Sequence, residues 1–208
     1  MSSSTLDEIL NRIHALQLEL EDEIDRLLSE KRQQFRYRLD QGKVRFEQGI
    51  QSLQRHHKVS LWTFLRKARI GHVLTSPIIY SAIIPFVLLD VIVSFYQYVC
   101  FPIYGIPKVK RSKYIILDRQ HLAYLNVIEK FNCIYCGYGN GLIEYVREVT
   151  ARTEKYWCPI KHATHSPDPH RLSREFADYG DAEVYKKRLA ELRSEIANLR
   201  QDEAAPKD

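Results

Sequence analysis

The N-terminal part of the chain repeats apolar residues at heptad spacing. The repeat consists of Leu6, Leu10, Ile13, Gln17, Leu20, Ile24 and Leu27, with Gln17 as its one polar member. This spacing gathers the side chains on one side of a helix and is typical of a coiled coil. A looser stripe follows, and no proline interrupts residues 1–76, so the pattern predicts a helix from about Thr5 to about His57. Its apolar side packs either on its own chain or on a second copy.

The C-terminal part predicts a second helix with the same spacing. Its apolar positions are Tyr185, Leu189, Leu192, Ile196 and Leu199. The stretch "HSPDPH", residues 165–170, precedes this helix and has the composition of a linker. We expect the helix to pack on the N-terminal one or on another protein.

Between these charged ends, Val73 to Ile106 forms one apolar stretch in which Asp90 is the single charged residue. About 20 helical residues cross the hydrocarbon core of a membrane, so the stretch is too long for one straight span and too short for two. Pro85 divides it into a shorter part before the proline and a longer part after it, and predicts a kink or a break there. Either the segment dips into the membrane and returns at Pro85, or it crosses once with a kink.

Basic residues flank the apolar stretch evenly. Five precede it (Arg55, Lys58, Arg66, Lys67 and Arg69) and five follow it (Lys108, Lys110, Arg111, Lys113 and Arg119). Lysine and arginine mark the cytoplasmic side of a membrane and attract anionic lipid headgroups. Equal numbers are expected if both flanks lie on the cytoplasmic face. The preceding segment, residues 59–72, is basic and amphipathic and contains Trp62, which suits a membrane interface.

Asp90 lies among aliphatic residues, where an unpaired carboxylate costs several kcal/mol. We expect it to be hydrogen-bonded to Gln97, to Tyr80 or to backbone freed at Pro85. The functional alternative is a proton or ion site, or a contact with a lipid headgroup.

Two pairs of potential metal ligands follow the apolar stretch. Cys133 and Cys136 form the first pair, and Cys158 and His162 form the second, beyond residues 137–157. Four such ligands in two close pairs are what a tetrahedral zinc ion requires. The glycines of "CGYGNG" predict a turn around the first pair, between two helices, and His165 is a possible substitute for His162. Iron or another redox metal, thiol redox chemistry and no site at all are the alternatives.

Short stretches around these ligands resemble known metal sites. "CIYCGYGNG" resembles the first knuckle of rubredoxin-type and zinc ribbons, and "WCPIKH" is similar to the second. The resemblance is confined to these two stretches and implies iron or zinc, and the histidine in the fourth position favours zinc. Taken whole, the chain also resembles bacterial membrane proteins, which implies the bacterial inner membrane but supplies no activity.

These patterns predict a mainly α protein of five segments, with a short candidate strand in the apolar run after Pro107. The segments are an N-terminal coiled-coil helix at 1–58, a basic interfacial segment at 59–72, a membrane segment at 73–106, a Cys3His metal domain at 107–171 on the cytoplasmic face, and a C-terminal helix and tail at 172–208.

The predicted function is that of a membrane-anchored, non-enzymatic scaffold or interaction protein with a structural zinc site. Its partners are a bilayer with anionic headgroups and either a second copy or a coiled-coil protein. The alternative is a membrane-associated redox protein or enzyme that uses its metal on a lipid-like substrate. Nucleic acid is disfavoured, because the basic residues gather beside the apolar stretch rather than around the cysteines.

Overall fold

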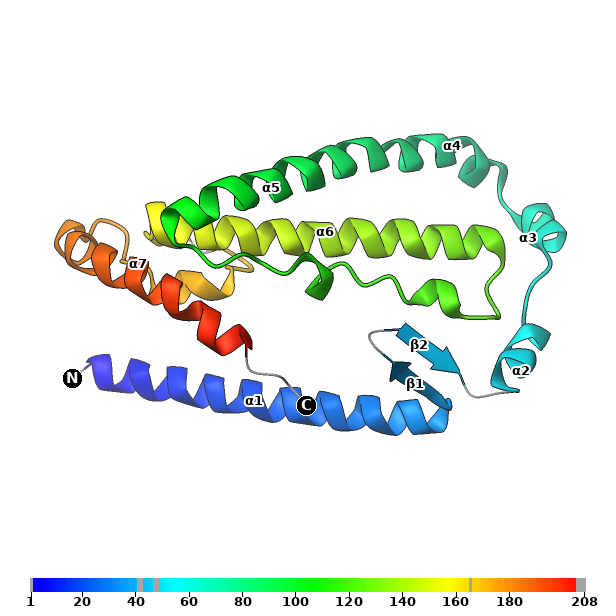
Figure 1. Cartoon of the computed structure of the whole chain (residues 1–208), viewed down its shortest axis with the longest axis horizontal. Coiled ribbons are helices and arrows are strands. Elements are labelled where there is room, and N and C mark those ends of the chain that lie inside the picture. The colour runs from blue at the N-terminus through cyan, green and yellow to red at the C-terminus, as the bar shows by residue number, and fades with distance from the viewer. Residues whose placement is uncertain (1, 41–42, 47–48, 165, 205–208) are drawn as a thin grey trace. The chain divides into compact units, whose positions relative to one another are not determined.

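The computed structural model describes residues 2–40, 43–46, 49–164 and 166–204 (Figure 1), and it confirms a mainly α protein. Contacts divide the chain into two compact units. The first unit combines Met1–Leu65 with Asp118–Glu129, and the second combines Arg66–Leu117 with Lys130–Asp208. These units differ from the five segments expected, because residues 107–117 and 130–171 pack with the apolar helices and the C-terminal helix rather than by themselves.

Helix α1, Ser2–Gln34, carries the N-terminal heptad repeat. Ile13 is 37% exposed, and Ile24 and Leu27 are each 45% exposed. The side chains of Leu6 and Leu10 lie outside what the structure describes. The described apolar side of α1 is therefore not buried in the first unit.

The prediction of one helix to His57 is wrong beyond Gln34. Arg36 adopts a left-handed backbone with φ of 49°, which takes the chain out of the helix. An antiparallel pair of strands follows, β1 (Tyr37–Asp40) and β2 (Lys43–Phe46), in which the Tyr37 and Phe46 rings lie 5.8 Å apart. Here apolar and polar residues alternate, and that local period of two prevails over the looser helical stripe.

Two short helices lead to the apolar stretch. Helix α2, Ile50–His56, begins after Gly49, whose φ of 90° favours glycine. Helix α3, Leu61–Lys67, belongs to the predicted interfacial segment, and its Trp62 is 69% exposed.

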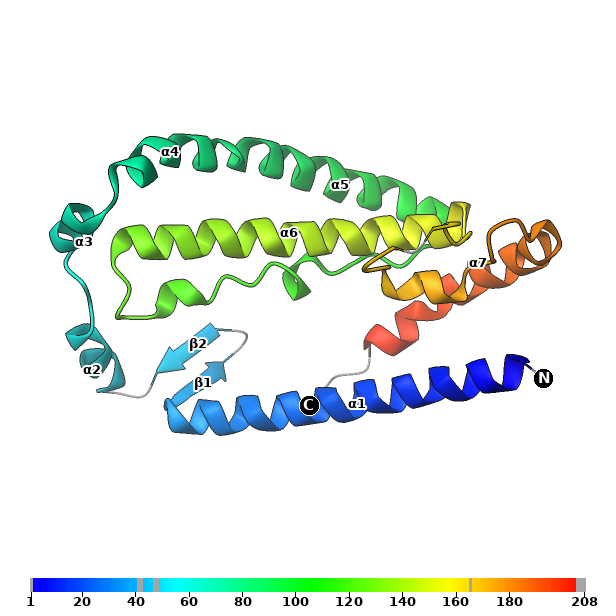
Figure 2. The same ribbon diagram turned by 180° about the vertical axis from the view of Figure 1, so that it is seen from behind.

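The apolar stretch forms α4, Ile70–Ser81, and α5, Ile83–Tyr104. The interruption falls at Ala82 and leaves Pro85 in the first turn of α5, where its missing N–H has no intrahelical partner to lose. Figures 1 and 2 show both helices following one gently curved course, so the reversal at Pro85 that a re-entrant segment requires is not formed. Together Ile70–Tyr104 make one helical segment that is long and apolar enough to cross a membrane.

After Gly105 the chain passes through two short 3-10 turns, η1 (Arg111–Lys113) and η2 (Arg119–His121). Residues 114–117, where a strand was a candidate, are irregular rather than paired in a sheet. We call residues 106–117 the return segment. It is followed by α6, Val127–Trp157, whose first turn is capped reciprocally by Asn126 and Glu129.

Helix α6 runs alongside α4 and α5 in the same direction. Near one end the Tyr80 hydroxyl donates a 2.5 Å hydrogen bond to Asn132, and near the other the Tyr104 and Tyr156 rings stack with centroids 5.5 Å apart. The interval from position 80 to position 104 equals that from position 132 to position 156. The two helical courses therefore stay in register.

The glycines of "CGYGNG" lie inside α6, so the prediction of a turn there is wrong. They instead allow neighbouring chain to approach the helix. A Cβ added at Gly139 would lie 3.0 Å from the Phe86 ring. One added at Gly141 would lie 2.5 Å from the Tyr114 carbonyl oxygen and 2.8 Å from the Ile115 Cα. Glycine at position 141 is thus required by the backbone of the return segment.

The C-terminal helix α7, Ala182–Ala204, packs within its own chain. Leu192 is 1% exposed and Ile196 is fully buried. Ile196 joins a core cluster with residues of α5, the return segment and α6: Phe101, Ile106, Val109, Leu142, Tyr145 and Val149. At these positions the apolar pattern of α7 reflects intrachain packing. The side chain of Leu199 lies outside what the structure describes.

We expect the substitution Gly141→Ala to destabilise the protein by about 1–3 kcal/mol or to prevent folding, because the added methyl overlaps backbone atoms. The matched control is Gly71→Ala in α4, where an added Cβ meets nothing within 4 Å. Alanine there should be neutral or stabilising by up to about 1 kcal/mol. Thermal unfolding in detergent compares the two variants, and equal effects would contradict the close packing at Gly141.

Candidate functional site

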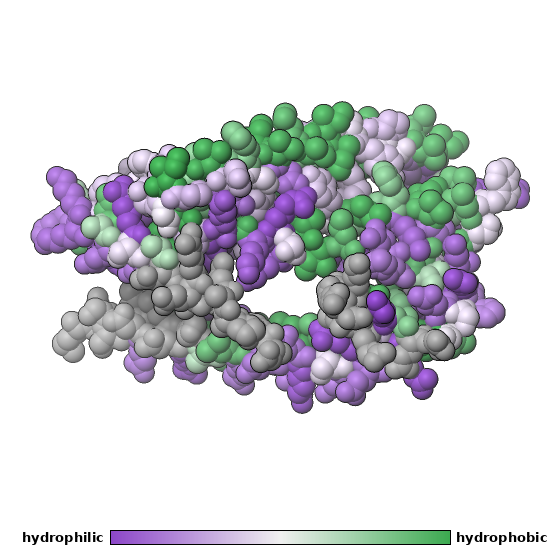
Figure 3. Space-filling model, viewed as in Figure 1, coloured by the Kyte–Doolittle hydropathy of each residue, from purple (hydrophilic) through white to green (hydrophobic). Residues whose placement is uncertain are grey.

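Helix α5 carries its polar residues on the side that the chain covers and its apolar residues on the opposite side. Asp90 and Gln97 are each 8% exposed. The opposite side presents Ile84, Val87, Leu88, Val91, Ile92, Phe95, Tyr98, Val99 and Ile103, all more than a third exposed. Figure 3 shows hydrophobic side chains gathered over α4 and α5. This arrangement is the inverse of a helix on the surface of a water-soluble protein.

Asp90 is held by Arg111 of the return segment. The arginine Nε lies 3.0 Å from Oδ1, and Nη2 lies 2.6 Å from Oδ2, which forms a two-point ion pair. The Tyr138 hydroxyl of α6 donates to Oδ2 at 2.9 Å. The hydrogen bond to Asp90 raises the pKa of Arg111 further above its usual value. Asp90 is therefore paired, as expected, but its described partners are not the predicted Gln97 and Tyr80.

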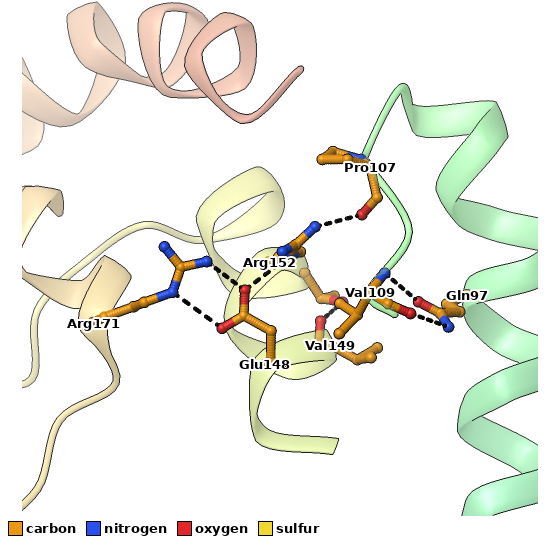
Figure 4. Close-up of polar contacts among 8 residues, drawn as sticks. Gln97, Pro107, Val109, Glu148, Val149, Arg152 and Arg171 are labelled. Carbon is orange, nitrogen blue, oxygen red and sulfur yellow. Dashed lines mark hydrogen bonds and ion pairs between the residues drawn. The ribbon is translucent and has the colours of Figure 1, made fainter. Parts of the chain in front are cut away.

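The side-chain amide of Gln97 contacts both the N–H and the carbonyl group of Val109 in the return segment (Figure 4). Its amide oxygen accepts a 2.9 Å hydrogen bond from the Val109 N–H, and its Nε2 lies 3.3 Å from the Val109 carbonyl oxygen. The same Nε2 lies 2.6 Å from the Tyr145 hydroxyl of α6. One buried amide thus joins α5, the return segment and α6. Ser94 lies between these contacts, 3.3 Å from Asp90 and 3.3 Å from the Tyr145 hydroxyl. We call the group formed by Asp90, Ser94, Gln97, Arg111, Tyr138 and Tyr145 the polar seam.

A buried ion pair of α6 also contacts the return segment. Arg152 of α6 is fully buried and donates to Glu148 at 2.9 Å and to the Pro107 carbonyl oxygen at 2.9 Å. Arg171, in the 3-10 turn η3 (Arg171–Glu175), donates to the same carboxylate at 2.6 Å. Burial acts to raise the pKa of Glu148, but the two guanidinium groups outweigh burial and hold the pKa below its usual value. Glu148 therefore remains an anion at neutral pH and acts as an acceptor between two cations.

Lys155 connects α6 to the C-terminal part of the chain. Its side chain is 3% exposed, and its ammonium group contacts Glu175 of η3 and lies 3.2 Å from Glu195 of α7. Arg193 of α7 also donates to the Tyr156 carbonyl oxygen at 2.9 Å. These contacts and the buried Leu192 fix α7 on α6.

The structure does not bring the four predicted metal ligands together. Cys133 and Cys136 lie on α6, whereas Cys158 and His162 follow the other end of that helix. The continuous helix from Cys136 to Trp157 rises about 30 Å, far beyond the roughly 2 Å metal–ligand bonds that a shared ion requires. Among the described residues, no group of three or more histidine, cysteine, aspartate or glutamate side chains is placed to hold a metal ion. Zinc or iron binding stays a prediction, because the described residues do not bring the four ligands to one ion.

The second predicted pair also lacks the expected helical start. Pro159 is buried, and Ile160 forms a parallel bridge with Ala177, so this stretch is extended. Cys158 is exposed at the surface. Partial desolvation of its thiol and the nearby negative charge of Glu154 raise the pKa of that thiol. A raised pKa disfavours the thiolate that binds metals and acts as a nucleophile. His165 lies outside the described residues.

Sequence reasoning found Asp90 but missed Arg111, Glu148 and Arg152. In the sequence Arg111 is one of five basic residues after the apolar stretch, and nothing local marks it as the cation that pairs with Asp90. Glu148 and Arg152 have the i, i+4 spacing of a helical ion pair, which could have indicated that they pair with each other.

No family model matches this chain, and neither a curated protein nor a solved structure matches it. Its function is therefore argued from its own residues.

The separation of the cysteines gives a test of the metal hypothesis. We expect the double variant Cys133→Ser, Cys158→Ser to keep the metal content and unfolding temperature of the unchanged protein, as should the control Cys100→Ser. Cys100 lies in α5 and outside the predicted ligand set. Elemental analysis and thermal unfolding of the full chain measure both quantities. One zinc or iron per chain, lost only in the double variant, would show that the two pairs share an ion, either through a break in α6 or between two chains.

Proposed function

We propose that the protein is a membrane-anchored, non-enzymatic interaction protein. The segment formed by α4 and α5 attaches it to a bilayer, and the apolar side of α1 binds a partner helix. The observation that carries this proposal is the inverted α5, which is apolar where it is exposed and polar where the chain covers it. Such a helix suits a lipid environment outside and a protein environment inside.

The surroundings of the apolar segment support attachment to anionic lipid. Exposed apolar residues continue into α4, where Ile70 is 78%, Leu74 is 72% and Ile78 is 71% exposed. Helix α3, with Trp62 and two basic residues in its last turn, precedes the segment, and further basic residues follow it. Each lysine or arginine near an anionic surface contributes about 1 kcal/mol of attraction, and tryptophan favours the headgroup level.

The exposed side of α1 supports the interaction role. Its described apolar positions keep heptad spacing from Ile13 to Leu27, and they are exposed. Burying an exposed leucine at a helix interface contributes about 1.5–3 kcal/mol. A polar residue at a core position, as Gln17 would be, helps to fix the register and number of helices. We infer a second copy of the same chain as the partner.

Zinc belongs to this proposal only as a prediction from the sequence. For one ion to take all four ligands, α6 would have to break, or the two pairs would have to come from different chains. The alternative function, metal-dependent redox chemistry or catalysis on a lipid-like substrate, carries the same requirement.

We expect Leu20→Asp to convert a dimer of the full-length protein into a monomer, because it places a charge in the proposed interface between two α1 helices. Leu20 is 59% exposed, so the monomer's own fold should be unaffected. Leu18→Asp is the matched control, since Leu18 is 51% exposed and lies about 200° around the helix from Leu20. Sedimentation in detergent measures the mass.

Dimers of both the unchanged protein and the Leu18→Asp variant, beside a monomeric Leu20→Asp variant, would support the proposed interface. A monomer in all three cases would contradict pairing between copies. Loss of the dimer in both variants would place the interface elsewhere on α1.

A further inference from the structure

We propose that the segment formed by α4 and α5 lies lengthwise in one face of the membrane and does not cross it. Its exposed apolar side enters the outer part of the hydrocarbon, and α6 covers its polar side from the water. This inference rests on the proposed membrane attachment and specifies its geometry.

Helix α6 is joined to the apolar segment along most of its length. Contacts join the two courses at three levels, from Tyr80 with Asn132, through Asp90 with Tyr138, to Tyr104 with Tyr156. The matched intervals between the first and last of these levels correspond to about 36 Å of helix. If α4 and α5 crossed a bilayer, α6 would cross beside them over the same depth.

Helix α6 is too charged for that environment. Its charged residues are Glu129, Lys130, Glu144, Arg147, Glu148, Arg152, Glu154 and Lys155. Each charge placed at the centre of a membrane helix costs roughly 2.5–3.5 kcal/mol on insertion scales. Glu148 and Arg152 satisfy each other, but Glu144, which lies 3.7 Å from Arg147, keeps 59% of its side chain accessible. Among the described residues, Ile70–Tyr104 is the one helical segment that is long and apolar enough to cross a membrane.

The return segment gives the same result. It lies against the middle of α5 through Val109 and Arg111, and it contains Lys108, Lys110 and Lys113. Its backbone is irregular except for one 3-10 turn. Irregular backbone and lysines are not stable at hydrocarbon depth unless protein surrounds them. Lys110 and Lys113 are exposed.

The two helices also present different chemistry on their outer sides. The outer side of α5 is apolar along its length, whereas the outer side of α6 is mixed: Asn140, Glu144, Arg147 and Thr150 lie there beside the exposed Ile143. A spanning pair would need lipid-compatible residues all round. A pair lying along the interface needs them on one side only.

The length of the apolar segment and the residues at the border of its apolar side fit the same placement. A helical segment of 35 residues is about 52 Å long, well above the roughly 30 Å of a hydrocarbon core. Lys108 holds its ammonium group 4.2 Å from the centre of the Tyr98 ring, whose residue is 69% exposed at the border of the apolar side. Tyrosine and lysine together favour the level of the headgroups. With the segment in the interface, basic residues along it, such as Arg69 before α4 and Lys108 beside Tyr98, can reach the same anionic surface.

The test uses full-length protein bound to vesicles of phosphatidylcholine and phosphatidylglycerol. A fluorescent amino acid is inserted singly at Leu74, Ile84, Phe95 or Ile103, all exposed on the apolar side, and at Thr150 on α6 as the control. Lipids brominated at different acyl depths then quench each probe. We expect the four apolar positions to report one common shallow depth, with the control unquenched.

The contrary outcomes are distinct. A depth that reaches the centre of the bilayer at Ile84 or Phe95 and becomes shallow towards both ends would mean a span and would overturn this inference while keeping the membrane anchor. No quenching at any position would overturn both, because the apolar side would then face protein rather than lipid.

Discussion

The pairing of Asp90 with Arg111 is the constraint on which the rest of the second unit depends. A carboxylate in the middle of an apolar helix must be neutralised, and the cation that does so belongs to the chain returning from the end of α5. This pair and the amide of Gln97 hold the return segment against α5. Glycine at 141 then lets α6 approach the backbone of that segment. The long parallel packing of α5 and α6 follows from these contacts.

That packing separates two kinds of surface. The polar groups of α5 are used inward, on tyrosines of α6 and on the return segment, and its aliphatic side chains are left outward. The buried Arg152 and Lys155 carry the same set of contacts on to the return segment and α7. The result is a layer with an exposed apolar side on α5, while α1 carries exposed apolar residues of its own. In the proposed function, anchoring and partner binding therefore rest on different parts of the chain.

The sequence predicted features that depend on local composition, and it failed where long-range contacts decide. The apolar stretch, its interruption near Pro85 and the need to pair Asp90 follow from residue types alone. The three glycines predict a turn from their local pattern, but they serve close approach of distant residues, such as the backbone of Tyr114 and Ile115 at Gly141. The four metal ligands matched a known spacing, but the chain between the two pairs forms helix and keeps them apart. The strands after Gln34 were hidden by a weak continuation of the heptad stripe.

The most direct test of this account is a double-mutant cycle on Asp90→Asn and Arg111→Gln, with unfolding free energy measured in detergent. Arg111 keeps 47% of its side chain exposed, so the pair is weaker than a fully buried one. The two-point geometry still predicts a coupling energy of about 1 kcal/mol or more, with the double variant less damaged than the two single effects combined. Effects that simply add, within about 0.3–0.5 kcal/mol, would show that the pair does not organise the fold and would contradict the account.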